Sequence, residues 1–133
     1  MTHCDGYRAA AVAHAADLAG VGVDAEPLAP LPSGVLELVS TPDERACLAA
    51  LPGAQHADRV LFSAKESVFK VWWPLVRTWL GFEDALVTLA ADGTFVADLL
   101  RPDLGVPRLA GRWAARDGFV LTAVTLGHDA PRT

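Results

Sequence analysis

Lysine is rare in this chain and asparagine is absent. Lys65 and Lys70 are the two lysines among eleven basic residues, and the other nine are arginines. The net charge of −5 excludes the basic footprint of a protein that binds duplex nucleic acid. No apolar run reaches the roughly 20 residues of a membrane span, and the first residues lack the basic and apolar regions of a signal peptide. We therefore expect a cytoplasmic protein that binds neither nucleic acid nor membrane.

Cysteine is also scarce, which limits the kinds of site that the chain can build. Cys4 and Cys47 are its two cysteines. Without a secretory signal we expect free thiols in a reducing compartment, and a disulfide between them is the less favoured alternative. The sequence has no Cys-x-x-Cys motif and no paired histidine spacing, so a zinc site is disfavoured.

The order of the expected elements predicts a single α+β domain over residues 1–133, with an antiparallel sheet packed against a long helix. Hydrophobic residues make up 52% of the chain, which is enough for one core. From periodicity and turn residues we expect strands at 7–14 and 18–26, helices at 41–50 and 58–79, and strands at 85–90, 94–100, 108–115 and 119–126.

Local signals mark the ends of several of these elements. Thr41 followed by Pro42 is typical of a helix N-terminus. Pro74 lies inside the long helix and predicts a kink. Residues 91–93 and 116–118 each end in Asp-Gly, which predicts two hairpin turns.

Aromatic residues and the chain end carry further expectations. Trp72 and Trp79 lie on the apolar stripe of the long helix, so we expect core packing rather than base stacking. Trp73 lies off the stripe and is a candidate for partner contact. Residues 127–133 are expected to be loose.

Two acidic residues share one side of the second expected strand. Asp24 and Glu26 are two positions apart, so both side chains point the same way, together with Gly22. Gly22 has no side chain and would leave room beside them for a ligand. A solvated strand end is the simpler interpretation of such a pair taken alone, because charged side chains usually face water.

The long helix adds a third carboxylate and both lysines. Glu66 and Lys70 are four residues apart and share the face of Ser63, away from the apolar stripe. Taken alone, they form an ordinary helix-surface ion pair. Three converging carboxylates would repel one another and raise their pKa values, and a hard divalent cation resolves that conflict. Mg²⁺ suits such oxygen ligands and commonly bridges to phosphates. Ser63 lacks a His–acid partner, so a nucleophilic role for it is disfavoured.

Three segments in a fixed order carry a family resemblance. They are residues 2–7 (THCDGY), 20–26 (GVGVDAE) and 62–70 (FSAKESVFK). Together they resemble the signature of the 4′-phosphopantetheinyl transferases, and the continuation at residues 72–75 (WWPL) is similar to the larger members of that family. These enzymes move the phosphopantetheine arm of coenzyme A onto a serine of an acyl or peptidyl carrier protein, giving the holo carrier and adenosine 3′,5′-bisphosphate.

The resemblance implies a role for each motif residue. Asp24, Glu26 and Glu66 would hold Mg²⁺, and Glu66 or a water on the metal would take the proton of the carrier serine. Lys70 would steady charge on the transferring phosphate or on the departing nucleotide. Lys65 would lie near the pantetheine or phosphate, and His3 would contact a nucleotide phosphate. Such a site works by positioning and charge neutralisation.

The chain departs from the family pattern at its N-terminus. The larger members are pseudo-dimers of two similar halves, and this chain begins almost inside the motif at residues 2–7. The resemblance therefore implies one half-domain without most of the first half. Two explanations are open. The chain is a fragment of a longer enzyme, or it works as a homo-oligomer, like the small holo-acyl-carrier-protein synthases. An inactive half-domain that retains metal or carrier-protein binding is the alternative function.

Overall fold

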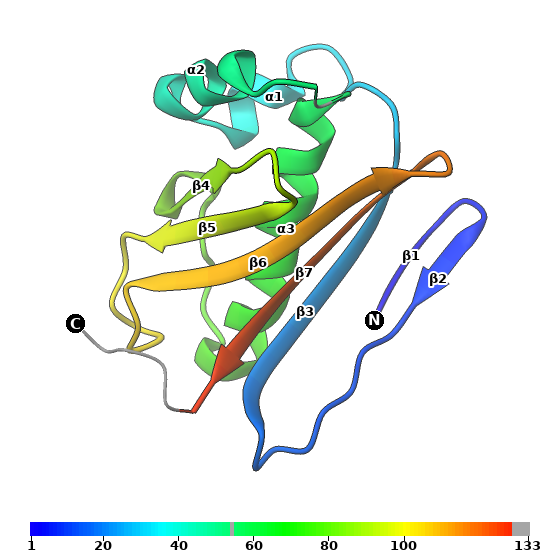
Figure 1. The fold of residues 1–133 in the computed structure, drawn as a ribbon. Coiled ribbons are helices and arrows are strands. Elements are labelled where there is room, and N and C mark those ends of the chain that lie inside the picture. Colours follow the sequence, from blue (N-terminus) through cyan, green and yellow to red (C-terminus); the bar gives the residue numbers. More distant parts are fainter. Residues whose placement is uncertain (54, 129–133) are drawn as a thin grey trace.

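A five-stranded antiparallel sheet packs one face against a single long helix, α3 (Ala57–Val76), in the computed structural model, which describes residues 1–53 and 55–128 (Figure 1). The α+β fold predicted from the sequence is confirmed. The strands follow the spatial order β3 (Leu18–Pro27), β7 (Phe119–Gly127), β6 (Arg108–Arg116), β5 (Thr94–Leu99) and β4 (Ala85–Leu89). Within the described residues, no helix is long and apolar enough to cross a membrane.

The four C-terminal strands form where the sequence predicted them. Asp117 and Gly118 both have positive φ, as a two-residue hairpin turn requires, and they join Arg116 to its cross-strand partner Phe119. In the preceding hairpin Gly93 has φ 91°, and the Asp92 carboxylate accepts hydrogen bonds from the backbone and hydroxyl of Thr94. Short local signals therefore determine both hairpins.

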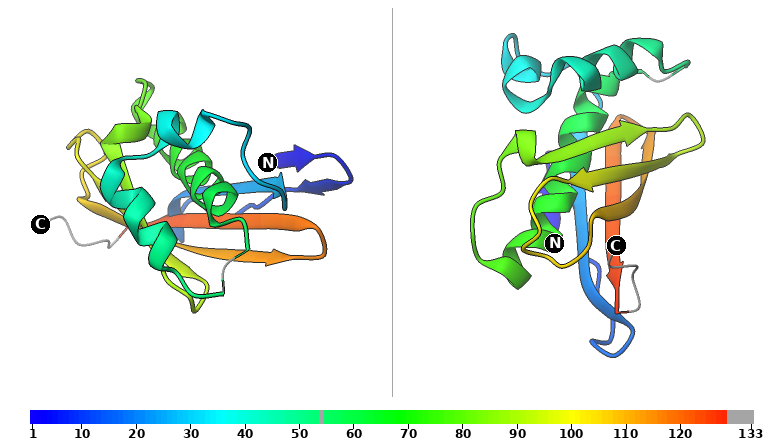
Figure 2. Two further views of the ribbon diagram at one scale, coloured as in Figure 1. Left: turned by 90° about the horizontal axis from the view of Figure 1, so that it is seen from above. Right: turned by 90° about the vertical axis from the view of Figure 1, so that its left-hand side faces the viewer.

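Two short helices cover one end of α3 (Figure 2). Helix α2 (Pro42–Ala50) begins with a capping box. The Thr41 hydroxyl accepts a hydrogen bond from the backbone N–H of Glu44, and the Glu44 carboxylate accepts one from the backbone N–H of Thr41. Helix α1 (Val35–Val39) was not predicted, because a five-residue helix has too few positions to show a periodicity.

The long helix carries the core. Its buried apolar side chains recur at helical spacing and pack against alternate residues of β7, including Val120 and Val124. The helix continues through Pro74 but ends at Val76, because Arg77 adopts a left-handed conformation with φ 64°. Trp79 therefore lies beyond the helix and is 66% exposed, so the prediction that it packs in the core is wrong. It contacts Phe69 instead, whereas Trp72 is fully buried as predicted.

The N-terminal hairpin differs from the one predicted. Strand β1 (Thr2–Cys4) pairs with β2 (Tyr7–Ala9), and β3 pairs with β7 along its whole length. The expected pairing of residues 7–14 with 18–26 is wrong, because β7 offers β3 a longer partner whose inner face is already apolar. The hairpin still lies against β3, since the Thr2 hydroxyl accepts a hydrogen bond from the backbone of Ala25. The expectation of a loose end falls, from residue 129 on, outside the described residues.

Candidate active site

Asp24 and Glu26 lie on the face of β3 that packs against α3. Gly22 shares this face, and a Cβ at Gly22 would lie 2.2 Å from the backbone oxygen of Ser67 on α3. The prediction that these residues share a face is confirmed, but the space beside Gly22 is filled by the helix backbone. Gly22 therefore brings the helix close to the strand rather than making room for a ligand.

Asp24 is buried and has both carboxylate oxygens engaged. Oδ2 accepts a hydrogen bond from the Ser63 hydroxyl at 2.8 Å, and Oδ1 lies 3.1 Å from the Lys70 ammonium. Lys70 also donates to the carbonyl of Val23 at 2.9 Å, while its side chain stays 31% exposed. The fold thus brings the Asp24 carboxylate of β3 together with the Lys70 ammonium of α3, which lies four residues after Glu66.

Glu26 lies at the outer end of the same strand face. Its carboxylate is 3.3 Å from the Arg59 guanidinium. Burial and the neighbouring Asp24 carboxylate raise the pKa of Glu26 to about 7, and Arg59 opposes the rise. Burial, Glu26 and Asp24 also raise the pKa of the Cys4 thiol, which shows that strand β1 lies within electrostatic reach of the two carboxylates.

Glu66 is half-buried on α3, one helical turn before Lys70. Burial raises its pKa, the Asp24 carboxylate raises it further, and Lys70 lowers it. Glu66 also lines a cavity of about 240 Å³ whose walls include Phe69, Trp79 and Leu80. This carboxylate therefore lies within electrostatic reach of Asp24 and also borders a largely apolar hollow.

Lys65 is engaged in the interior of the protein. Its ammonium lies 2.8 Å from Glu44 and donates to the carbonyl of Phe82 at 2.6 Å, and both charged side chains are almost completely buried. The pKa of Lys65 is lowered, chiefly by burial and against the effect of Glu44. Glu44 was missed as a partner, because its place in the capping box already explains an acidic residue there. Lys65 also lines the hollow beside Glu66.

His3 is exposed on β1, opposite Arg8 of β2. Strand alternation places its side chain on the other side of β1 from Thr2 and Cys4, which face β3. The motif at residues 2–7 therefore lies beside the strand carboxylates through Thr2 and Cys4. The predicted contact of His3 with a nucleotide phosphate stays a prediction.

The acidic residues suit a hard cation by their chemistry. Among residues 1–53 and 55–128, no group of three His, Cys, Asp or Glu side chains is arranged so that it could hold a metal ion. Lys70 and Arg59 each contact one of the strand carboxylates. Asp24 raises the pKa of both glutamates, so it lies within electrostatic reach of each of them. Three oxygen-donor side chains against two cations leave a net negative charge, which suits the chemistry of Mg²⁺.

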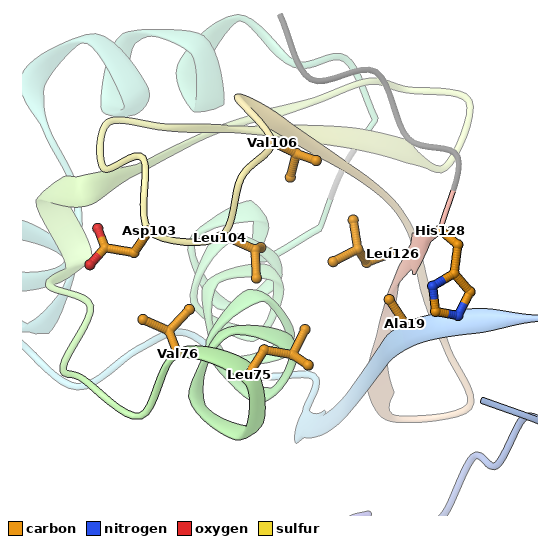
Figure 3. Close-up of a pocket in the computed structure, with 9 residues that line it drawn as sticks. Ala19, Leu75, Val76, Asp103, Leu104, Val106, Leu126 and His128 are labelled. Atoms are coloured by element: carbon orange, nitrogen blue, oxygen red, sulfur yellow. The ribbon is translucent and has the colours of Figure 1, made fainter. Parts of the chain in front are cut away.

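A second cavity, of about 210 Å³, lies toward the C-terminal end of α3 (Figure 3). Its walls are mostly aliphatic, with Leu75, Leu104 and Leu126 among them, and Asp103 and His128 also line it. Asp103 pairs with Arg101. This cavity lacks converging carboxylates, so it is a poorer candidate for chemistry than the strand–helix contact.

Comparison with known proteins identifies the family of the chain. Residues 20–124 match the family model of the 4′-phosphopantetheinyl transferase superfamily. The chain is 51% identical to the 4′-phosphopantetheinyl transferase Npt of Nocardia iowensis, over 93% of this chain and 62% of that protein. It is 52% identical to Svp of Streptomyces mobaraensis, over 98% and 56%, and 46% identical to PptT of Mycobacterium tuberculosis, over 95% and 60%. The chain thus spans roughly 60% of the length of these relatives.

The fold also matches a solved structure. The holo-[acyl-carrier-protein] synthase of Thermotoga maritima superposes with a TM-score of 0.66 at 19% identity, over 83% of this chain and 64% of that one. At this identity the likeness establishes a common fold.

Proposed function

The chain belongs to the 4′-phosphopantetheinyl transferase superfamily, and we propose that it transfers the 4′-phosphopantetheine group of coenzyme A to a serine of an acyl or peptidyl carrier protein. The observation that carries the proposal is the meeting of Asp24 and Glu26 on β3 with Glu66 and Lys70 on α3. Three relatives named for this activity, at 46–52% identity, support it.

Asp24, Glu26 and Glu66 are the residues that would hold Mg²⁺. When bound, the ion would neutralise these carboxylates and polarise the phosphoryl oxygens of the substrate. The charges of the protein itself point the same way, because Lys70 and Arg59 are the cations that pair with Asp24 and Glu26 among the described residues, which leaves three carboxylates against two cations. A negatively charged pyrophosphate would be repelled from the site as it stands, so a divalent cation is needed for substrate binding.

Glu66 is the residue best placed to accept a proton. The carrier serine oxygen would attack the phosphorus next to the pantetheine arm, and the bond to the adenosine 3′,5′-bisphosphate oxygen would break. The serine proton would pass to Glu66, a half-buried carboxylate that also lines the adjoining hollow. The half-exposed ammonium of Lys70 would stabilise the negative charge that appears on the departing nucleotide.

The hollow beside Glu66 fits the arm that is transferred. Its walls combine aromatic and aliphatic side chains, among them Phe69, Trp79 and Leu80, with the charged Lys65 and Glu66 at one side. An extended arm of mixed polarity, ending at a phosphate, matches a largely apolar hollow that borders on a carboxylate. We assign Lys65 to this hollow, and His3 on β1 to a nucleotide phosphate.

The experiment is mass spectrometry of an apo carrier protein incubated with this chain, Mg²⁺ and coenzyme A. The expected result is a mass gain of one phosphopantetheine arm, and its loss on Glu66→Gln. The matched control is Glu37→Gln, which removes an exposed glutamate on α1 and should leave the rate unchanged. Full turnover by Glu66→Gln would refute the role of Glu66.

The incomplete coverage of the relatives favours a second candidate, a half-domain that binds Mg²⁺ or a carrier protein without transfer. It predicts calorimetric binding of Mg²⁺ or carrier protein and no product at high coenzyme A. Product formation by the purified chain excludes it.

Self-association would supply the surface that a second half provides in longer members. Trp73 and Trp79 are 41% and 66% exposed, and both rings contact that of Phe69 toward the end of α3. Apolar surface of this kind usually marks a partner, and we assign a second copy of this chain. Light scattering at micromolar concentration should give more than one chain per particle, and a monodisperse monomer contradicts the assignment. The cytoplasmic location stays a prediction.

A further inference from the structure

Three hydroxyl groups form a buried chain behind Asp24. Ser63 and Ser67 come from α3 and Thr122 from β7, directly across the strand pair from Asp24. The Thr122 hydroxyl lies 2.9 Å from the hydroxyl of Ser63 and 2.6 Å from that of Ser67, and all three side chains are at most 3% exposed. The Ser63 hydroxyl in turn lies 2.8 Å from Asp24 Oδ2.

The direction of these hydrogen bonds follows from counting protons. A hydroxyl donates one proton, and carboxylate and carbonyl oxygens only accept. Ser63 must therefore donate its proton to Asp24, and Thr122 donates its proton to the carbonyl oxygen of Ser63 at 2.9 Å. Ser67 is left as the donor to Thr122. Of the three hydroxyls, Ser63 consequently donates to the Asp24 carboxylate, while Thr122 holds the backbone of Ser63 and accepts from Ser67.

This arrangement gives the two oxygens of Asp24 different surroundings. Oδ2 is tied to the buried hydroxyls, and Oδ1 is turned toward the partly exposed ammonium of Lys70. We propose that Ser63 and Thr122 are positioning residues, which lock the Asp24 side chain in the rotamer that presents Oδ1 as a metal ligand. The inference rests on the proposed function, because it assigns Asp24 to the Mg²⁺ site.

The burial of the hydroxyls supports a positioning role. Their neighbours on the inner faces of α3 and the sheet are apolar, including Ala64, Val120 and Val124. Alanine or valine would fill the same volume without burying a polar group, which needs partners to avoid a penalty. Groups that orient a metal ligand from behind typically change metal affinity by about 10–100-fold when they are removed.

The experiment is titration of the purified chain with Mn²⁺, as a stand-in for Mg²⁺, followed by electron paramagnetic resonance of the free ion. Ser63→Ala removes the donor to Asp24 and is expected to weaken binding about 10-fold. Thr122→Val keeps the shape of the side chain and removes the middle hydroxyl, with an expected loss of roughly 3- to 10-fold, and Thr122→Ser should restore binding. Ser67→Ala is the matched control, because Ser67 is the hydroxyl of the three that contacts only Thr122, and its Mn²⁺ affinity should stay within about twofold of wild type.

Thermal unfolding of each variant separates positioning from stability. A purely structural cluster would lower the melting temperature without a graded loss of Mn²⁺ affinity, and Thr122→Val and Thr122→Ser would then bind Mn²⁺ equally well. Wild-type affinity in folded Ser63→Ala overturns the inference and leaves the proposed function standing. If wild-type protein binds no Mn²⁺, the metal site and this inference both fail, while product formation in the carrier-protein assay remains a separate measure of the transferase.

Discussion

Glu44→Ala is expected to destabilise the protein by about 4 kcal/mol, because it leaves the buried Lys65 ammonium without its counterion. The Glu44 carboxylate has a partner for each oxygen. Oε1 accepts from Lys65 at 2.8 Å and from the backbone of Thr41 at 2.9 Å, and Oε2 accepts from the backbone of Val87 at 2.8 Å. One side chain therefore joins α2, α3 and β4.

The magnitude follows from the burial of both partners. The Lys65 and Glu44 side chains are 2% and 4% exposed, so water cannot replace the lost carboxylate at the ammonium. Breaking a buried pair by removing one partner costs about 3–5 kcal/mol. Lys65→Met should cost less, about 2 kcal/mol, because Glu44 keeps its two backbone donors. Together the two changes should cost about 2 kcal/mol less than the sum of the single costs.

Urea unfolding at neutral pH measures these free energies, and thermal unfolding of Glu44→Ala should show a drop of about 15 °C. Asp98→Ala is the matched control. It breaks an ion pair with Arg108 whose side chains are 41% and 60% exposed, so it should cost less than about 0.5 kcal/mol. If Glu44→Ala and Asp98→Ala cost the same, or if the double variant is additive, the assignment of a stabilising buried pair is refuted.

Gly22→Ala should destabilise the protein by about 2–3 kcal/mol, because the new Cβ would lie 2.2 Å from the Ser67 carbonyl oxygen and force β3 away from α3. Gly127→Ala has open space around its new Cβ and is the control; equal unfolding free energies for the two variants would contradict the close packing. The pH dependence of stability should carry the signature of Glu26, whose pKa is about 7 in the folded protein and near 4.5 unfolded. The folded state binds more protons in this interval, so stability falls as pH rises from about 4.5 to 7. With chelator present, Glu26→Gln should exceed wild type by roughly 1–2 kcal/mol at pH 8 and match it near pH 4, and a gap that is the same at both pH values would exclude this titration.

Elements with local signals could be predicted from the sequence. The capping residue Thr41, the Asp-Gly turn at Asp117 and the apolar stripe of α3 each depend on neighbours within a few positions. The pairing of β3 with β7 joins residues about a hundred positions apart, such as Asp24 and Thr122, and no local pattern encodes it. The end of α3 was missed for a different reason. Arg77 adopts a left-handed backbone conformation, which the presence of an arginine in the sequence does not predict.

The same distinction explains which site residues could be found. Asp24 and Glu66 could be named as candidates because strand and helix periodicities predict which side chains share a face, and the motifs supplied the pairing of the two faces. Ser63 was considered only as a nucleophile and set aside for want of a basic partner. In the structure its hydroxyl donates a hydrogen bond to the Asp24 carboxylate. Such a contact depends on the register of β7 against β3 and on the rotation of α3 above them. Residues that orient a site from within the core therefore look like ordinary small polar residues in a sequence, and their partners in the fold are what give them a function.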